Sequence, residues 1–103
     1  MAGDSYRRIE SVKKTTDVLK FLAKERRLLT GSEVAEGVGL PTGTALCHLI
    51  TLADAGFVRQ VGEGWELGIG LALIWARVKA NIEGKINTLQ SELKALEVDD
   101  VTK

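Results

Sequence analysis

The segment from Thr30 to Val58 constrains this chain most, because it places two short helices on either side of a tight turn. Thr30 and Glu33 stand at capping-box spacing, where the hydroxyl accepts from the third amide and the carboxylate reaches back to the cap amide. Pro41 suits the start of the second helix, since its missing N–H would have no partner there. The segment therefore predicts a helix-turn-helix.

Small residues predict the bends of this segment. Ala35 is small where two helices must cross closely, and Gly37 and Gly39 permit the positive φ angles that a sharp turn requires. The second helix is expected over about residues 42–55. Gly56 follows it and is suited to a left-handed C-terminal cap.

A first helix is expected before this segment, with Ser11 as its N-cap. Apolar and small residues recur there at steps of three and four, which indicates one buried face: Val12, Thr15 or Thr16, Leu19 and Leu22. Residues 26–29 form the connector, where Leu28 and Leu29 are apolar enough for a short strand. Residues 1–8 are expected to be a flexible arm.

The segment after Gly56 reads as a β-hairpin. Residues 57–61 and 65–67 are β-prone, and Gly62-Glu63-Gly64 between them is a glycine turn signal. Trp65 is expected to cap the core rather than to stack on a partner. The hairpin carries one base, Arg59, against two acids.

A long helix is expected over residues 69–97. Its second half shows a heptad-like seam with steps of four, three, four and three, at Ile82, Ile86, Leu89, Leu93 and Leu96. Tethered to a folded domain, this seam is expected to form a homodimer; the alternative is that the helix folds back onto its own core. Gly84 costs about 1 kcal/mol relative to alanine and is a candidate bend. Residues 98–103 are expected to be a frayed acidic tail.

These residues resemble the N-terminal winged-helix domain of the IclR family of bacterial transcription regulators, from about Ile9 to Trp75. The resemblance rests on three stretches: SVKKTTDVLKFLAKERRLLTGSEVA at 11–35, GLPTGTALCHLITLADAGFV at 39–58, and WELG at 65–68, where the family usually has Tyr-x-Leu-Gly. It implies a mainly α fold: a winged helix-turn-helix with a three-helix core and a small β-wing, followed by a long C-terminal helix. The winged domain is assigned to residues 9–68.

The resemblance implies double-stranded DNA as the partner, with the second helix of the motif in the major groove. The base-facing positions are then Thr42, Gly43, Thr44, Leu46 and Cys47. The phosphate-facing positions are Lys13, Lys14, Arg26, Arg27, Ser32 and Arg59. Several base-facing positions are often Lys, Ser, His and Arg in the family, and none of the residues here makes the bidentate guanine contact that arginine supplies.

The net charge of the chain indicates no partner, but the distribution of its charged residues does. The chain has 14 basic and 14 acidic residues, so no overall field indicates a polyanion partner. Between Ser5 and Thr30, however, eight bases stand against three acids. The first helix and the arm before it are thus the basic part of the chain.

Catalytic and metal chemistry are not expected. The single cysteine, Cys47, excludes an intramolecular disulfide, and it points about 100° away from His48 around the helix, so the two form no zinc pair. His48 falls where the family usually has a core leucine, and a partly buried, hydrogen-bonded histidine is expected. No nucleophile or Walker motif is present. We therefore expect no enzyme activity and no cofactor.

The sequence thus predicts a cytoplasmic, DNA-binding transcription regulator. At 103 residues the chain has no room for the family's effector-binding domain, so no small-molecule effector is inferred, and no membrane contact is expected. The alternative is a protein-interaction module on the same fold that no longer reads DNA. It is motivated by an apolar outer face of the second motif helix, Leu46, Cys47 and Ile50.

Overall fold

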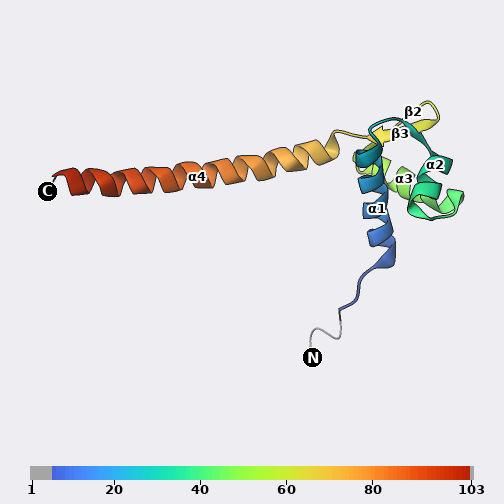
Figure 1. Ribbon diagram of the computed structural model, residues 1–103, viewed down its shortest axis with the longest axis horizontal. Helices are drawn as coiled ribbons and strands as arrows, with labels where there is room; N and C mark the ends of the chain where they lie inside the picture. Colours follow the sequence, from blue (N-terminus) through green and yellow to red (C-terminus); the bar gives the residue numbers. More distant parts are fainter. Residues whose placement is uncertain (1–5, 103) are drawn as a thin grey trace. The chain divides into compact units, whose positions relative to one another are not determined.

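The computed structural model describes residues 6–102, and side chains for residues 6–97. The chain divides into two compact units, residues 1–71 and 72–103. The elements follow the order α1 (Glu10–Glu25), β1 (Leu29–Thr30), α2 (Gly31–Val38), α3 (Thr42–Asp54), β2 (Val58–Val61), β3 (Gly64–Leu67) and α4 (Gly70–Thr102) (Figure 1). The predicted fold class, three helices with a small wing and a long final helix, is confirmed.

The core of the first unit lies where α1, α2 and α3 meet the sheet. Each of these elements contributes at least one side chain with little or no exposed surface. The buried core consists of Val18, Leu22, Leu29, Val34, Ala35, Ala45, Leu49, Leu52, Val58 and Trp65. Trp65 is only 4% exposed, which agrees with its expected role of capping the core.

Helix α1 begins two residues earlier than expected, at Glu10 instead of residue 12. Ile9 is the N-cap and no side chain caps the helix, so the prediction of Ser11 as the cap is wrong. Of the predicted buried face, Leu22 is buried and Leu19 packs against the core. Val12 is exposed, and Val18, which was not predicted, is fully buried. Val12 lies on the first turn, before α1 reaches the core.

The capping box of α2 is confirmed. The Thr30 hydroxyl accepts from the Glu33 amide at 3.1 Å, and the Glu33 carboxylate accepts from the Thr30 amide at 2.9 Å. Only one of the two glycines assigned to the turn has a positive φ: Gly39, at 71°. Gly37 lies inside α2 instead, where a Cβ would meet the Phe21 ring at 2.2 Å, so its role is close packing.

The end of α3 forms a Schellman motif. The Phe57 amide donates to the Leu52 carbonyl at 2.9 Å and the Gly56 amide to the Ala53 carbonyl at 3.0 Å, with Gly56 at a φ of 81°. This is the left-handed cap that the sequence predicts.

The turn after α3 also holds the start of α4. Gly68 donates to the Phe57 carbonyl at 2.8 Å and Gly70 to the Gly56 carbonyl at 2.9 Å. A Cβ on either glycine would lie within 2.8 Å of the Gly56 oxygen. The chain therefore approaches this turn closely only because both residues are glycine.

The sheet has three antiparallel strands in the order β1-β3-β2. Leu29 pairs with Trp65 and Gln60 pairs with Trp65 from the other side, so the connector strand joins the wing as expected. Gly62, at a φ of 61°, turns the hairpin.

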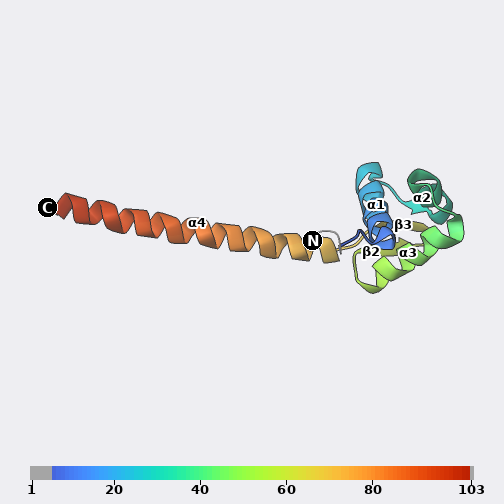
Figure 2. The same ribbon diagram turned by 90° about the horizontal axis from the view of Figure 1, so that it is seen from below.

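Helix α4 is one continuous helix that passes Gly84 without a break (Figure 2). The helix does not break at this candidate bend, because an exposed glycine lowers helix propensity without forcing a kink. The helix also extends to Thr102, past the predicted end at 97. Residues 1–5 and 103, and the side chains of residues 98–102, lie outside the described part of the chain. Most of the expected arm and tail falls in these residues. None of the described helices is both long enough and apolar enough to cross a bilayer.

Candidate nucleic-acid interface

A groove on the first unit brings the N-terminal turns of α2 and α3 to one place beside the wing. Its lining residues are Thr30, Gly31, Ser32, Thr42, Leu46, Gln60, Glu63 and Trp65. Ser32 belongs to the first turn of α2 and Thr42 begins α3. The positive ends of two helix dipoles and several hydroxyls therefore share one surface, a combination that favours anions.

Four of the five predicted base-facing residues are exposed on α3. Thr42, Gly43, Thr44 and Cys47 all present surface to solvent. Leu46 differs, because it is half-buried and packs against the core. A Cβ on Gly31 would meet a Leu46 methyl at 2.7 Å, so Leu46 fills the space between α3 and the start of α2.

The packing of Leu46 also reduces the apolar outer face that motivated the alternative function. Ile50, 54% exposed, remains as the large apolar side chain on that side of α3. The small Cys47 is also exposed, and isolated exposed apolar residues are normal on a protein surface. The case for a protein partner at this helix is weakened accordingly.

His48 ties α3 to α1. The Thr15 hydroxyl donates to the Ser11 carbonyl at 2.8 Å and lies 2.7 Å from His48 Nδ1. The Thr15 hydroxyl therefore joins the backbone of α1 to the His48 ring of α3. The expectation of a partly buried, hydrogen-bonded histidine is confirmed.

The predicted phosphate-contacting bases fall into two groups. Three of them already have carboxylate partners: Lys13 with Asp17 at 3.4 Å, Arg27 with Glu33 at 3.1 Å, and Arg59 with Glu66. Lys14 and Arg26 have no ion-pair partner within 4.0 Å among the described residues. Arg26 occupies the left-handed cap of α1 with a φ of 56°, and Ser32 is exposed on α2.

The Glu33 carboxylate is held ionised by its surroundings. The hydrogen bond from the Thr30 amide, followed by the one from Arg27, lowers the pKa of Glu33 below its ordinary value of 4.5. The same carboxylate thus caps α2 and binds Arg27. Arg27 is consequently less available for phosphate than its sequence position suggests.

The wing contributes one residue that the sequence analysis missed. Gln60 on β2 lines the groove together with Glu63 of the turn. The pairing of Gln60 with Trp65 places it at the groove, and period-two alternation from buried Val58 is the signal that locates its face. Glu63 brings a negative charge to the same surface, which opposes phosphate.

No metal site accompanies these residues. Within residues 6–97, where side chains are described, no cluster of three or more His, Cys, Asp or Glu side chains is arranged to hold an ion. Cys47 is exposed with a free thiol, and His48 is bound to Thr15.

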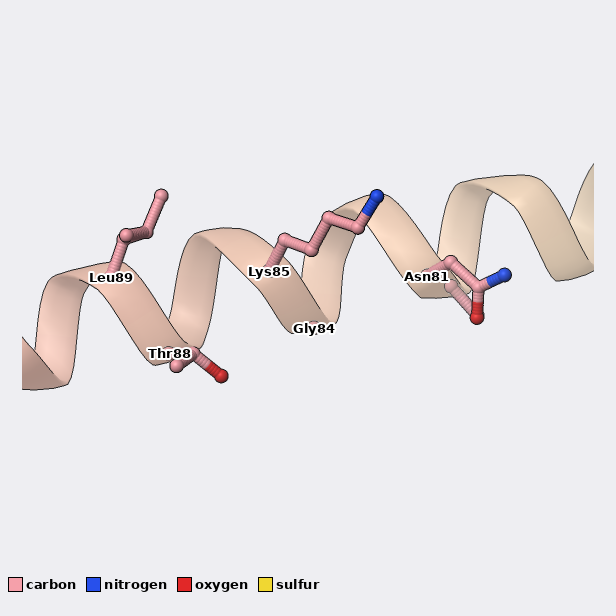
Figure 3. Close-up of a pocket in the computed structure, with 6 residues that line it drawn as sticks. Asn81, Gly84, Lys85, Thr88 and Leu89 are labelled. Carbon is pink, nitrogen blue, oxygen red and sulfur yellow. The ribbon is translucent and has the colours of Figure 1, made fainter.

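The predicted dimerisation residues lie on one exposed stripe of α4. Together with Trp75 and Val78 they form what we call the apolar face: Trp75, Val78, Ile82, Ile86, Leu89, Leu93 and Leu96. These side chains are between 47% and 65% exposed. In Figure 3, Leu89 of this face and Lys85 at its border project to the same side, whereas Thr88 points away and Gly84 leaves bare backbone. A shallow depression on the surface of α4 is lined by Ala80, Asn81, Gly84, Lys85, Thr88 and Leu89. It lies along one helix and is not an enclosed cavity.

Comparison with known proteins identifies the domain. The IclR helix-turn-helix domain matches residues 11–62. The transcriptional repressor IclR of Escherichia coli (strain K12) is 34% identical over 62 residues, which cover 58% of this chain and 23% of that protein. The acetate operon repressor of Salmonella typhimurium gives the same identity and coverage.

Solved structures agree. The IclR transcriptional regulator from Alicyclobacillus acidocaldarius superposes with a TM-score of 0.66 at 32% identity, over 70% of this chain and 30% of that one. Pseudomonas aeruginosa HmgR gives a TM-score of 0.61 at 28% identity, over 67% of this chain and 29% of that one. The matched segment is thus less than a third of each of these relatives.

Proposed function

Because the chain belongs to the family of the IclR helix-turn-helix domain, we propose that it is a DNA-binding transcription regulator that sets α3 into the major groove. The convergence of the α2 and α3 N-termini on one groove carries this proposal. Helix N-termini are sites where proteins hold phosphate groups. Two of them on one face, with Ser32 and Thr42 exposed beside them, suit a DNA backbone next to the recognition helix.

The bases predicted to contact phosphate set the expected strength of binding. Surface ion pairs are worth at most about 1 kcal/mol, so phosphate can compete for Lys13, Arg27 and Arg59. Lys14 and Arg26 have no ion-pair partner among the described residues. If only these two bases contact phosphate, log affinity falls against log salt with a slope of about −2. If the paired bases also contact phosphate, the slope approaches about −5.

Base recognition through α3 is expected to be weak. Thr42 and Thr44 are the exposed hydroxyls there, and a threonine hydroxyl donates or accepts and so discriminates little between bases. Gln60 at the groove is a side chain that can bind adenine bidentately. We therefore expect a modest ratio of specific to non-specific affinity.

The regulator is proposed to act as a homodimer through Ile82, Ile86, Leu89, Leu93 and Leu96. A two-fold pair presents two recognition helices, which matches two half-sites of a palindromic sequence. Each half-site then adds its own phosphate contacts.

Thr42→Glu tests the groove directly. A carboxylate at the first position of α3 is favourable for the helix dipole, so the fold is retained, while phosphate at the groove is repelled. Fluorescence anisotropy with a random duplex at low salt should show at least a tenfold loss of affinity, which corresponds to about 1.4 kcal/mol.

The matched control is Thr88→Glu, which makes the same change of charge on α4 away from its apolar face. It should bind DNA like the unaltered chain. Equal losses in both variants would show only a net-charge effect, and unchanged binding in Thr42→Glu would remove the groove from the interface.

A further inference from the structure

We propose that a second surface of the winged unit, at the end of α2 remote from the groove that faces DNA, binds an acidic amphipathic helix of a partner protein. This surface is a shallow groove between α1 and α2, which we call the α1–α2 groove. None of its residues belongs to the proposed DNA interface or to the proposed dimer. It is lined by Asp17, Lys20, Phe21, Lys24, Gly37 and Val38.

The α1–α2 groove lies at the C-terminal end of α2. Gly37 and Val38 are the last two residues of that helix, whereas Ser32, which lines the groove beside the wing, lies in its first turn. At 1.5 Å per residue, a helix of this length separates its two ends by about 10 Å. The α1–α2 groove is therefore distinct from the surface proposed to meet DNA.

The floor of the α1–α2 groove is apolar. The Phe21 ring packs against Gly37, where an added Cβ would overlap it. Phe21 and Val38 are both half-buried, because each packs against the core on its inner side and leaves its outer side in solvent. An apolar side chain of a partner that covers this outer side removes apolar surface from water, which favours binding.

The rim of the α1–α2 groove is basic. Lys20 and Lys24 are four residues apart on α1 and both are exposed. Neither has an ion-pair partner among the described residues. Asp17, the acidic residue of the rim, is already paired with Lys13 at 3.4 Å. The rim thus presents two uncompensated positive charges about 6 Å apart.

An acidic amphipathic helix matches both the floor and the rim. Two carboxylates four residues apart on a helix are also about 6 Å apart, so one of them can face Lys20 and the other Lys24. An apolar residue on the same side of that helix then covers Phe21. Laying the apolar face of a helix into an apolar groove is a common mode of peptide recognition.

A nucleic-acid backbone fits the α1–α2 groove less well. Asp17 on the rim repels phosphate, and the C-terminal end of α2 at Val38 carries a partial negative charge that does the same. A phosphate backbone also has no apolar group to cover Phe21. An acidic helix avoids this conflict, because its few carboxylates can face the two lysines while uncharged residues lie beside Asp17.

A titration of the isotope-labelled whole chain with a synthetic peptide, without DNA, tests the proposal. The peptide is an alanine-rich helix of about 15 residues, with two glutamates one turn apart and leucines on the same side. Its Kd should be on the order of 1 mM, because exposed ion pairs contribute little. The amide resonances of Phe21, Gly37 and Val38 should shift during the titration, whereas that of Thr42 should not.

Two altered peptides identify what the α1–α2 groove recognises. One has glutamine in place of both glutamates, and the other has alanine in place of the leucines. Each should bind several times more weakly than the first peptide. Equal binding by either altered peptide, or no shift at Gly37 with the first peptide at several times its expected Kd, would overturn the proposal.

Lys20→Gln combined with Lys24→Gln removes both charges of the rim while helix propensity is kept. This variant should bind the peptide about threefold to tenfold more weakly. The matched control, Arg77→Gln with Lys94→Gln, makes the same change of charge on α4 and should bind like the unaltered chain. Equal losses in the two variants would show only a net-charge effect and overturn the proposal.

Random duplex DNA separates a protein partner from a nucleic-acid partner. The variant with Lys20→Gln and Lys24→Gln should bind DNA with an unchanged salt slope. A slope shallower by about two would show that both lysines contact phosphate, which would overturn the proposal. If the unaltered chain binds no DNA, the proposed function fails, and the peptide titration still decides whether the α1–α2 groove binds an acidic helix.

Discussion

Replacing Gly70 with alanine is expected to destabilise the winged unit, although alanine normally stabilises a helix. A Cβ at residue 70 would lie 2.6 Å from the Gly56 oxygen and 2.8 Å from Phe57 Cδ1. Two of the three nearest atoms are backbone atoms of Gly56, and a change of side-chain rotamer cannot move them. The start of α4 must shift, which lengthens the 2.9 Å hydrogen bond from the Gly70 amide to Gly56.

The net effect follows from three contributions. Overpacking costs about 1–3 kcal/mol, and loss of the hydrogen bond costs about 1 kcal/mol. The gain from replacing glycine at a helix start is below about 1 kcal/mol. The free energy of unfolding should therefore fall by about 2 kcal/mol, which for a unit of this size lowers Tm by roughly 10 °C.

Gly43→Ala is the matched control. It also lies in the first turn of a helix, its φ is not positive, and no atom lies within 4 Å of the added Cβ. It should raise the free energy of unfolding by about 0.5–1 kcal/mol. Urea unfolding followed by near-ultraviolet circular dichroism measures both. Equal shifts in the two variants would refute the close approach at Gly70.

Three shorter predictions concern the core, the cap and the wing. Leu49→Ala leaves a cavity at a fully buried site and should cost about 2–5 kcal/mol in urea unfolding. The pKa of Glu33 is lowered in the fold, so its carboxylate stabilises the fold above the unfolded pKa, and this stabilisation is lost as pH falls through the folded pKa. Glu33→Gln should therefore reduce the pH dependence of the free energy of unfolding between neutral and acidic pH, and an unchanged pH dependence would contradict this. Glu66→Gln frees Arg59 and should steepen the DNA salt slope by about one.

Local chemistry is what the sequence predicts best here. The capping box at Thr30 and the cap at Gly56 depend on residues within a few positions of each other, so their spacing alone identifies them. Trp65 was placed in the core because a large aromatic residue in a short hairpin has few other places to pack. The fold class followed from these local signals together with the resemblance.

What the sequence did not reveal depends on contacts between distant residues. Gly37 looked like a turn glycine, and only the approach of Phe21 from α1 shows its packing role. Leu46 was predicted to face outward, but in the fold it packs against Gly31 at the start of α2. The pairing of Arg59 with Glu66 arises from strand register, and it changes which bases are available for phosphate.

The most direct test of the proposed function is a fluorescence-anisotropy titration of the chain with random duplex DNA, repeated over a series of salt concentrations. We predict saturable binding, with log affinity falling against log salt at a slope between about −2 and −5 for each chain bound. Absence of binding at low salt, or a slope near zero, would contradict DNA binding through this winged helix.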